Sequence, residues 1–314
     1  AWSPSPVRRA AFNARFGLAV ARSLEEVLDA PDVEAVMLLT PPDTRLELVQ
    51  RIAAAGTHVL MEKPLERSLA GAETIVALTA SAGVTTGVVF QHRFRESTDA
   101  LRGHLARGTL GRIASVQLDV PWWRPQSYYD EPGRGTLARD GGGVLITQAI
   151  HSMDVMLSLT GPVASVQAIA GTSAMHEMES EDFVGAGLVF ANGALGALLA
   201  TTSFRPGLTE KLVLAGTEAT AVLAGSQVDI YRADGTKETV GEVQPSGGGA
   251  DPMAFDHGWH KALITDFLDA LDQGRPPRVT AREALEVHRL IDALLRSSAE
   301  GRRVELASPQ GALA

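Results

Sequence analysis

In residues 1–92 short apolar runs alternate with segments whose apolar positions recur at helical spacing. The apolar runs predict buried strands at Val33 to Thr40, His58 to Met61 and Val84 to Phe90. The other segments carry helix start and stop signals. They are Val7 to Phe16 before Gly17, a short helix opened by the capping box Ser23-Leu24-Glu25-Glu26, Pro41-Pro42-Asp43 through Ala55 before Gly56, and Ser68 to Ala82 before Gly83. This alternation predicts a parallel sheet of the doubly wound, nucleotide-binding type.

From residue 93 onwards the pattern changes to longer stretches of alternating apolar and polar residues, which is typical of antiparallel strands. The predicted strands are Ile113 to Val120, Val163 to Gly171, Phe183 to Phe190, Ala194 to Thr202 and Lys211 to Leu223. The Asn192-Gly193 dipeptide favours a tight hairpin turn between two of them. Helices are expected at Thr98 to Arg107, Val144 to Leu159, Lys261 to Gln273 and Arg282 to Ala299.

Together these patterns predict two domains. Residues 1–92 would form a Rossmann-like α/β domain, and residues 93–314 an α+β domain with an open-faced, mainly antiparallel sheet. The segment Pro245 to Ala250, with three consecutive glycines, is the best candidate for a flexible loop.

Composition narrows the range of functions. A chain of 314 residues with 45% hydrophobic residues can bury a full core, and 28 basic against 37 acidic residues argue against a nucleic-acid partner. The absence of cysteine excludes disulfides, thiolate nucleophiles and cysteine-ligated metals, and we predict no metal site. No apolar run approaches the ~18 residues that span a bilayer. We therefore expect a cytoplasmic protein without membrane or nucleic-acid partners.

The triplet Glu62-Lys63-Pro64 follows a predicted strand of the parallel sheet. Ligands of such sheets bind beyond the carboxyl ends of the strands, so Lys63 is a candidate site residue. A partly desolvated lysine can donate to a substrate hydroxyl or carbonyl, and burial readily lowers its pKa. A solvated loop lysine beside a proline explains the triplet equally well.

A second candidate lies where Gly141-Gly142-Gly143 opens a predicted helix. Thr147, His151 and Asp154 stand at i, i+4 and i+7, which places them on one helical face. An imidazole with a pKa near neutrality can move the proton that leaves a hydroxyl as its carbon gives up hydride. A core histidine bonded to a backbone carbonyl is the alternative, but the glycine run and the aligned partners favour a catalytic role.

These motifs occur in an order that resembles the Gfo/Idh/MocA oxidoreductase family. They are Thr40-Pro41-Pro42-Asp43-Thr44, Glu62-Lys63-Pro64, the glycine run and His151-Ser152-Met153-Asp154. The resemblance covers nearly the whole chain. It implies hydride transfer between NAD(P) and a carbon of a sugar, cyclitol or related cyclic alcohol, with Lys63 polarising the reacting oxygen and His151 as acid/base. Thr147 stands where the family often has an aspartate, so His151 must act with Lys63 or water, or the chemistry differs. Thr147 and Asp154 are expected as relay or substrate contacts.

The resemblance also implies a cofactor site. Its expected contacts are Thr40, Pro41, Pro42, Glu62, Lys63 and Gln91, together with Arg134, which matches a family Trp-Arg pair although Gly133 holds the tryptophan position. Family members begin with a strand and a G-x-G-x-x-G loop that this sequence lacks, so we expect a chain short of its first βα unit that binds cofactor poorly or not at all. Ser3 and Arg8, with Arg9, stand where an acid usually binds the adenosine ribose, which favours NADP over NAD. An exposed arginine pair is the alternative.

A loop with aromatic and cationic residues is the candidate substrate surface. It contains Trp122, Trp123, Arg124, Tyr128 and Tyr129, of which Trp123, Arg124 and Tyr128 are expected to bind substrate with Lys63 and His151. Burial between domains explains the loop equally well. Two other functions stay open, a cyclic dihydrodiol dehydrogenase of the same family and a ligand- or nucleotide-sensing member without turnover. An open sheet face predicts a homodimer or homotetramer.

Overall fold

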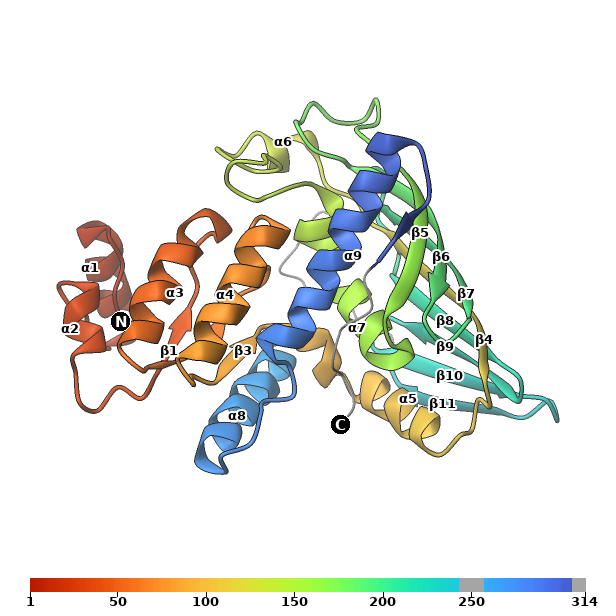
Figure 1. Ribbon diagram of the computed structural model, residues 1–314, viewed down its shortest axis with the longest axis horizontal. Coiled ribbons are helices and arrows are strands. Elements are labelled where there is room, and N and C mark those ends of the chain that lie inside the picture. The colour runs from red at the N-terminus through yellow and green to blue at the C-terminus, as the bar shows by residue number, and fades with distance from the viewer. Residues whose placement is uncertain (243–256, 307–314) are drawn as a thin grey trace.

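Two sheets of unequal size organise the protein (Figure 1). The computed structural model describes residues 1–242 and 257–306, so the predicted loop Pro245 to Ala250 lies outside the described residues. The smaller sheet has the order β1-β2-β3, and its neighbouring strands pair in parallel. Its strands are β1 (Ala35–Leu38), β2 (His58–Met61) and β3 (Thr86–Val88). The predicted Rossmann-type parallel sheet is confirmed; β2 has the predicted bounds, and β1 and β3 are shorter than their apolar runs.

Helices connect and cover these strands where the sequence predicts them. They are α1 (Pro6–Phe16), α2 (Leu24–Leu28), η1 (Pro42–Thr44), α3 (Arg45–Ala54) and α4 (Leu69–Ser81). The Ser23 hydroxyl accepts from the amide of Glu26, and the Ser68 hydroxyl caps α4 through the amide of Gly71. Side-chain caps therefore fix where α2 and α4 begin.

Within the described residues the larger sheet contains nine strands in the order β11-β10-β9-β8-β4-β7-β6-β5-β12. They are β4 (Ile113–Pro121), β5 (Val163–Gly171), β6 (Phe183–Phe190), β7 (Leu195–Thr201), β8 (Lys211–Gly216), β9 (Ala219–Ala224), β10 (Gln227–Arg232), β11 (Lys237–Gly241) and β12 (Val304–Glu305). Only the β4–β7 pair is parallel, so the predicted mainly antiparallel sheet is confirmed. The Asn192-Gly193 dipeptide lies between β6 and β7, which pair antiparallel as expected.

The predicted extent of one strand in this sheet is wrong. The run Lys211 to Leu223 forms two strands, β8 and β9, that turn at Thr217 and Glu218. The amide of Thr217 donates to Arg112 and that of Glu218 to Leu110, so the chain folds back around the start of β4. Gly216 permits this because a Cβ there would come within 1.9 Å of the Leu110 carbonyl oxygen. A tertiary contact therefore ends the strand where alternation alone would continue it.

Of the remaining helices, α8 (Gly258–Asp272) packs on the smaller sheet through Leu263 and Phe267, and most of the others lie against one face of the larger sheet or between the two sheets (Figure 1). These others are η2 (Gln91–Phe94), α5 (Glu96–Ala106), α6 (Gln126–Tyr129), η3 (Leu145–Ala149), α7 (Ile150–Thr160) and α9 (Ala281–Glu300). The buried face of α9 packs on both α4 and β5, so one hydrophobic core joins the two sheets. The opposite face of the larger sheet carries exposed apolar side chains, among them Ile169 and Leu195, which are 75% and 62% exposed.

The expected helix Val144 to Leu159 has a different form. It begins with a π-helical turn, η3, and continues as α7. Because a π-helical turn holds more residues than an α-helical turn, the i, i+4, i+7 spacing does not align Thr147 with His151 and Asp154. Within the described ranges no helix combines the length and the apolar character needed to cross a membrane.

Candidate active site

Lys63 follows β2 at the carboxyl edge of the smaller sheet and is half-buried. Its Nζ donates to the carbonyl oxygen of Thr147 in η3 at 2.6 Å, which brings the two domains' candidate residues together. Desolvation is the main cause that lowers the pKa of Lys63 to about 8; Glu62 opposes it, and the charges of Arg45 and Arg134 act in the same direction as desolvation. Lys63 can therefore hold or release a proton near physiological pH.

His151 lies in the first turn of α7 and is buried. Its ring faces His92, with centroids 4.8 Å apart, and the edge of Phe90 at 5.8 Å. Its Nδ1 has no hydrogen-bond partner among the described residues. Burial first, then the positive charges of Lys63 and Arg95, lower the pKa of His151 well below 6.5. The expected near-neutral pKa is therefore wrong, because the imidazole is enclosed beside cations and stays neutral.

His92, which sequence reasoning missed, forms the surface behind His151. Its Nε2 lies 2.8 Å from Arg95 Nη2, and because a guanidinium only donates, Nε2 is the acceptor. The neutral ring therefore carries its hydrogen on Nδ1, which is buried without a partner among the described residues. Burial, then Arg95 and His151, keep the pKa of His92 well below its ordinary value. The rule that pointed to Lys63 could have found His92, because it too lies just after a parallel strand.

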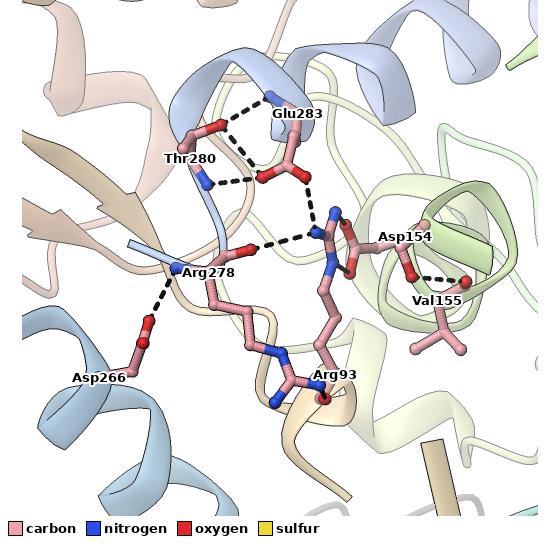
Figure 2. Close-up of polar contacts among 8 residues, drawn as sticks. Arg93, Asp154, Val155, Asp266, Arg278, Thr280 and Glu283 are labelled. Carbon is pink, nitrogen blue, oxygen red and sulfur yellow. Dashed lines mark hydrogen bonds and ion pairs between the residues drawn. The ribbon is translucent and has the colours of Figure 1, made fainter. Parts of the chain in front are cut away.

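Thr147 and Asp154 do not meet His151 in the way the helical spacing predicts. Thr147 offers its carbonyl to Lys63, and its hydroxyl contacts the Gly143 carbonyl at 2.5 Å. Asp154 is fully buried and binds the Arg93 guanidinium through both oxygens, at 2.6 and 2.7 Å (Figure 2). The expected proton relay through Asp154 is therefore replaced by a buried ion pair.

The glycine run brings three segments together. A Cβ on Gly143 would lie 1.8 Å from the Glu181 carbonyl oxygen, and one on Gly141, whose φ is +84°, would lie 2.3 Å from that of Arg67. The Glu181 carboxylate accepts from the amides of Gly143 and Leu145, each at 3.1 Å, and so caps the start of this helix. Arg67 belongs to the segment that follows Lys63. The glycines thus serve packing that places η3 against the Lys63 segment.

The carboxyl edge of the smaller sheet carries the expected cofactor residues. Thr40, Glu62 and Gln91 follow β1, β2 and β3, and Pro41 and Pro42 continue from Thr40. Thr40 Oγ1 and Gln91 Oε1 are buried without a partner among the described residues. Unpaired polar atoms at this edge fit a nicotinamide nucleotide, which would give them hydrogen-bond partners.

The N-terminal candidates lie on and before α1. The Ser3 carbonyl accepts from Arg9 at 2.5 Å, and the Ser3 hydroxyl accepts from the amide of Ser5. Arg8 is exposed, and its backbone amide donates to the Ser5 hydroxyl that caps the helix. Arg9 rather than Arg8 is therefore joined to Ser3.

The aromatic and cationic loop divides into two parts. Trp122 and Arg124 are buried, and the Arg124 guanidinium lies over the rings of Trp122 and Tyr128. Arg134 lies over Tyr128 at 4.9 Å, and Gln148 donates to the Tyr128 hydroxyl at 3.3 Å. Trp123 turns to His176 and Arg205 instead. Tyr128 and Arg134 are thus brought to the side of η3 and Lys63, whereas Trp123 is directed elsewhere.

Both halves of the chain match models of one protein family. The model described as an oxidoreductase family with an NAD-binding Rossmann fold matches residues 1–90, and the GFO/IDH/MocA C-terminal domain matches residues 98–222. The 1,5-anhydro-D-fructose reductase of Ensifer adhaerens is 26% identical over 312 residues, covering 97% of this chain and 89% of that protein. The scyllo-inositol 2-dehydrogenase (NADP(+)) IolW of Bacillus subtilis is 24% identical over 306 residues, covering 91% and 83%.

Solved structures agree with this assignment. The WlbA dehydrogenase from Bordetella pertussis, solved with NADH and UDP-GlcNAcA, superimposes with a TM-score of 0.84 at 28% identity, covering 98% of this chain and 89% of that one. Levoglucosan dehydrogenase, solved with NADH and levoglucosan, has the same fold with a TM-score of 0.84 at 22% identity, covering 98% and 89%. With a Rossmann-type half, a nine-stranded C-terminal half and matches along both, this chain belongs to the Gfo/Idh/MocA family of NAD-binding oxidoreductases.

Proposed function

We propose that the protein is a dehydrogenase or reductase that transfers hydride between NAD(P) and the carbon of a hydroxyl or carbonyl group on a sugar, cyclitol or related cyclic alcohol. The observation that carries the proposal is the position of Lys63. Its ammonium lies at the carboxyl edge of the nucleotide-binding sheet, beside a buried neutral histidine, and desolvation lowers its pKa to about 8. A lysine of this pKa suits proton exchange with a reacting oxygen.

The nicotinamide, when bound, donates or accepts the hydride. Thr40, Glu62 and Gln91 would hold it at the strand ends. In the reducing direction protonated Lys63 donates a proton to the carbonyl oxygen, and in the oxidising direction neutral Lys63 accepts the hydroxyl proton. His151 stays neutral, and because its Nδ1 is enclosed, Nε2 is the nitrogen left to hydrogen-bond the substrate oxygen. Lys63 thus moves the proton and His151 orients the oxygen.

The substrate class follows from the surroundings of Lys63 and from the relatives. Tyr128 and Arg134 supply a ring face and a cation on the same side as η3, which suits a cyclic polyol. Relatives named as an anhydrofructose reductase and as inositol dehydrogenases support the same class. The NADP-dependent relative and the Ser3–Arg9 contact support NADP as the preferred cofactor.

A second candidate function is a nucleotide- or ligand-sensing protein without turnover. The direct test measures cofactor reduction or oxidation by absorbance in the full-length protein, with NAD and NADP against a panel of sugars, cyclitols and cyclic dihydrodiols. We expect turnover that Lys63→Met abolishes, whereas Lys237→Met on the exposed strand β11 leaves it unchanged. Cofactor binding without turnover on any substrate would favour the sensor, and an active Lys63→Met protein would refute the site.

The open face of the nine-stranded sheet is proposed to bind a second copy of the chain. Ile169 on β5 and Leu195 on β7 are exposed there, and the small residues Gly185 and Gly187 of β6 lie between these strands. An exposed apolar face of this kind is usually covered in an oligomer. Light scattering should give the mass of a dimer or tetramer, and Leu195→Glu should lower it. A monomeric wild-type chain would contradict this proposal.

A further inference from the structure

The backbone of the Lys63 segment is held from behind by two buried side chains that lie outside the substrate space. Arg45 is the first residue of α3, and His288 lies within α9. Neither belongs to a motif identified in the sequence. Their contacts converge on the four residues from Glu62 to Leu65.

Arg45 ties together the carboxyl ends of two parallel strands. Its Nε and Nη2 both donate to the Thr40 carbonyl, at 3.1 and 2.9 Å. Nη2 also donates to the Lys63 carbonyl at 3.3 Å, and Nη1 donates to the Glu62 carbonyl. Burying a cation on neutral carbonyls is costly. Burial lowers the pKa of Arg45 to about 10, although Glu62 and Glu66 oppose this. The planar guanidinium reaches three carbonyls at once, which an ammonium cannot do in the same geometry.

His288 holds the other end of the segment. Its Nε2 accepts from the amide of Leu65 at 3.2 Å. Burial first, then the charge of Arg45, lower the pKa of His288 to about 4, so the ring stays neutral and remains an acceptor above that pH. The backbone on both sides of Lys63 is therefore fixed to elements that pack in the core.

We propose that Arg45 and His288 are positioning residues for Lys63, which hold the backbone of Glu62 to Leu65 so that the Lys63 ammonium stays against the π-helical turn before His151. The proposal rests on the proposed function, because it adds these two residues to the site of Lys63. It assigns them no contact with substrate or cofactor.

Arg45 also contributes a charge that faces Lys63. The other groups that act on Lys63 are Glu62, Arg134 and Asp140, with the neutral ring of His151 and the carbonyl of Thr147. Arg45 lowers the pKa of Lys63. Replacing Arg45 by glutamine removes both the charge and the three-carbonyl contact, whereas replacing it by lysine removes only the contact. The two variants therefore separate geometry from electrostatics.

The first experiment follows acetylation of Lys63 by acetic anhydride as a function of pH, with the modified peptide measured by mass spectrometry. The wild type should be half-maximal near pH 8, because only the neutral amine reacts. Arg45→Gln should move this midpoint to higher pH, and Arg45→Lys should leave it near 8. Arg51→Gln is the matched control, since Arg51 lies on the same helix and pairs with Glu25 at the surface.

The second experiment compares kcat with the KM for cofactor. Arg45→Lys and Arg45→Gln should lower kcat by roughly 10- to 100-fold, because small misplacements of a reacting group have effects of this order. These variants should also raise the KM for cofactor, because Arg45 holds the carbonyls of the cofactor residues Thr40 and Glu62, whereas the His288 variants should leave that KM within about twofold, because His288 holds the amide of Leu65. His288→Leu, which leaves the Leu65 amide unpaired, should lower kcat, and His288→Gln should restore much of it because its amide oxygen can accept.

The two experiments separate the possible failures. Folded Arg45 variants with an unchanged acetylation midpoint and unchanged kcat would overturn the proposal, as would a His288→Leu protein as active as His288→Gln. If the Arg45 variants do not fold, the His288 pair decides the question through the same kcat comparison. If the wild type turns over no substrate, the acetylation midpoint of Arg45→Gln still tests whether the charge of Arg45 acts on Lys63, so the proposed function can fail while this part of the proposal stands.

Discussion

The buried ion pair between Arg93 and Asp154 gives a quantitative test of how the two sheets are joined. Arg93 lies in η2, Asp154 in α7 and Glu283 in the first turn of α9, and the guanidinium lies between the two carboxylates (Figure 2). Burial alone would lower the pKa of Arg93, but the charges and hydrogen bonds of Asp154 and Glu283 together outweigh burial and raise that pKa above its ordinary value. Asp154→Asn removes the closer charge and leaves the cation buried.

The expected loss of stability follows from burial. The Arg93 and Asp154 side chains are 4% and 0% exposed, and removing one partner of such a pair costs about 3–5 kcal/mol of unfolding free energy. The matched control is Asp292→Asn. Asp292 pairs with Arg296 at 3.3 Å on the surface of α9, where the Arg296 and Asp292 side chains are 52% and 35% exposed, so its loss should cost less than about 1 kcal/mol.

Equilibrium urea unfolding, followed by tryptophan fluorescence and circular dichroism, measures both variants. A double variant, Arg93→Met with Asp154→Leu, removes both charges and should recover most of the stability that Asp154→Asn loses. The reasoning is refuted if Asp154→Asn is no less stable than Asp292→Asn, or if the double variant is less stable than the single one.

Three further predictions concern pH and packing. Because the pKa of Lys63 is about 8, kcat/KM for oxidation should rise as pH increases through 8 and that for reduction should fall; the same direction in both would exclude Lys63 as the proton-exchanging group. Gly143→Ala should cost about 1–3 kcal/mol by urea unfolding because its Cβ meets the Glu181 carbonyl, whereas Gly103→Ala in α5, whose Cβ would meet only the flexible end of the Arg107 side chain, should not lower stability. The pKa of His288 is about 4 in the folded protein and about 6.5 in the unfolded chain, so the unfolded chain binds the proton first as pH falls. The free energy of unfolding should therefore fall by up to roughly 3 kcal/mol between pH 6.5 and 4. His288→Gln should make stability less dependent on pH over this range in acid titrations.

The sequence predicted the elements whose signals are local. Capping serines and the Asn192-Gly193 turn act within a few residues, and the structure has the expected elements there. The hairpin of β10 and β11 also has a local signal in the sequence, the turn dipeptide Asp234-Gly235 between two alternating stretches. The break between β8 and β9 had none, because it depends on contacts with residues more than a hundred positions earlier.

The residues of the candidate site likewise divide into those with a local sequence signal and those that depend on tertiary packing. Lys63 was identified from its place at a strand end, a property of one short segment. Its backbone supports are not visible in the sequence, because Arg45 and His288 reach it only through the packing of α3 and α9. Asp154 was assigned to a relay because a regular α-helix was assumed, and neither the π-helical turn nor the partner Arg93 can be read from local spacing.

The order of the nine strands also bears on aggregation. One edge of the sheet is β12, which has two residues, and the other is β11, which has five and carries Lys237 and Glu238. Short and charged edge strands discourage the addition of a strand from another chain. In the described part of the chain, the edges of the larger sheet therefore resist the addition of further strands, while its apolar face stays open. Association of two chains is thus directed to face-to-face contact, which gives a closed oligomer. Edge-to-edge contact, which would propagate into a larger aggregate, is disfavoured.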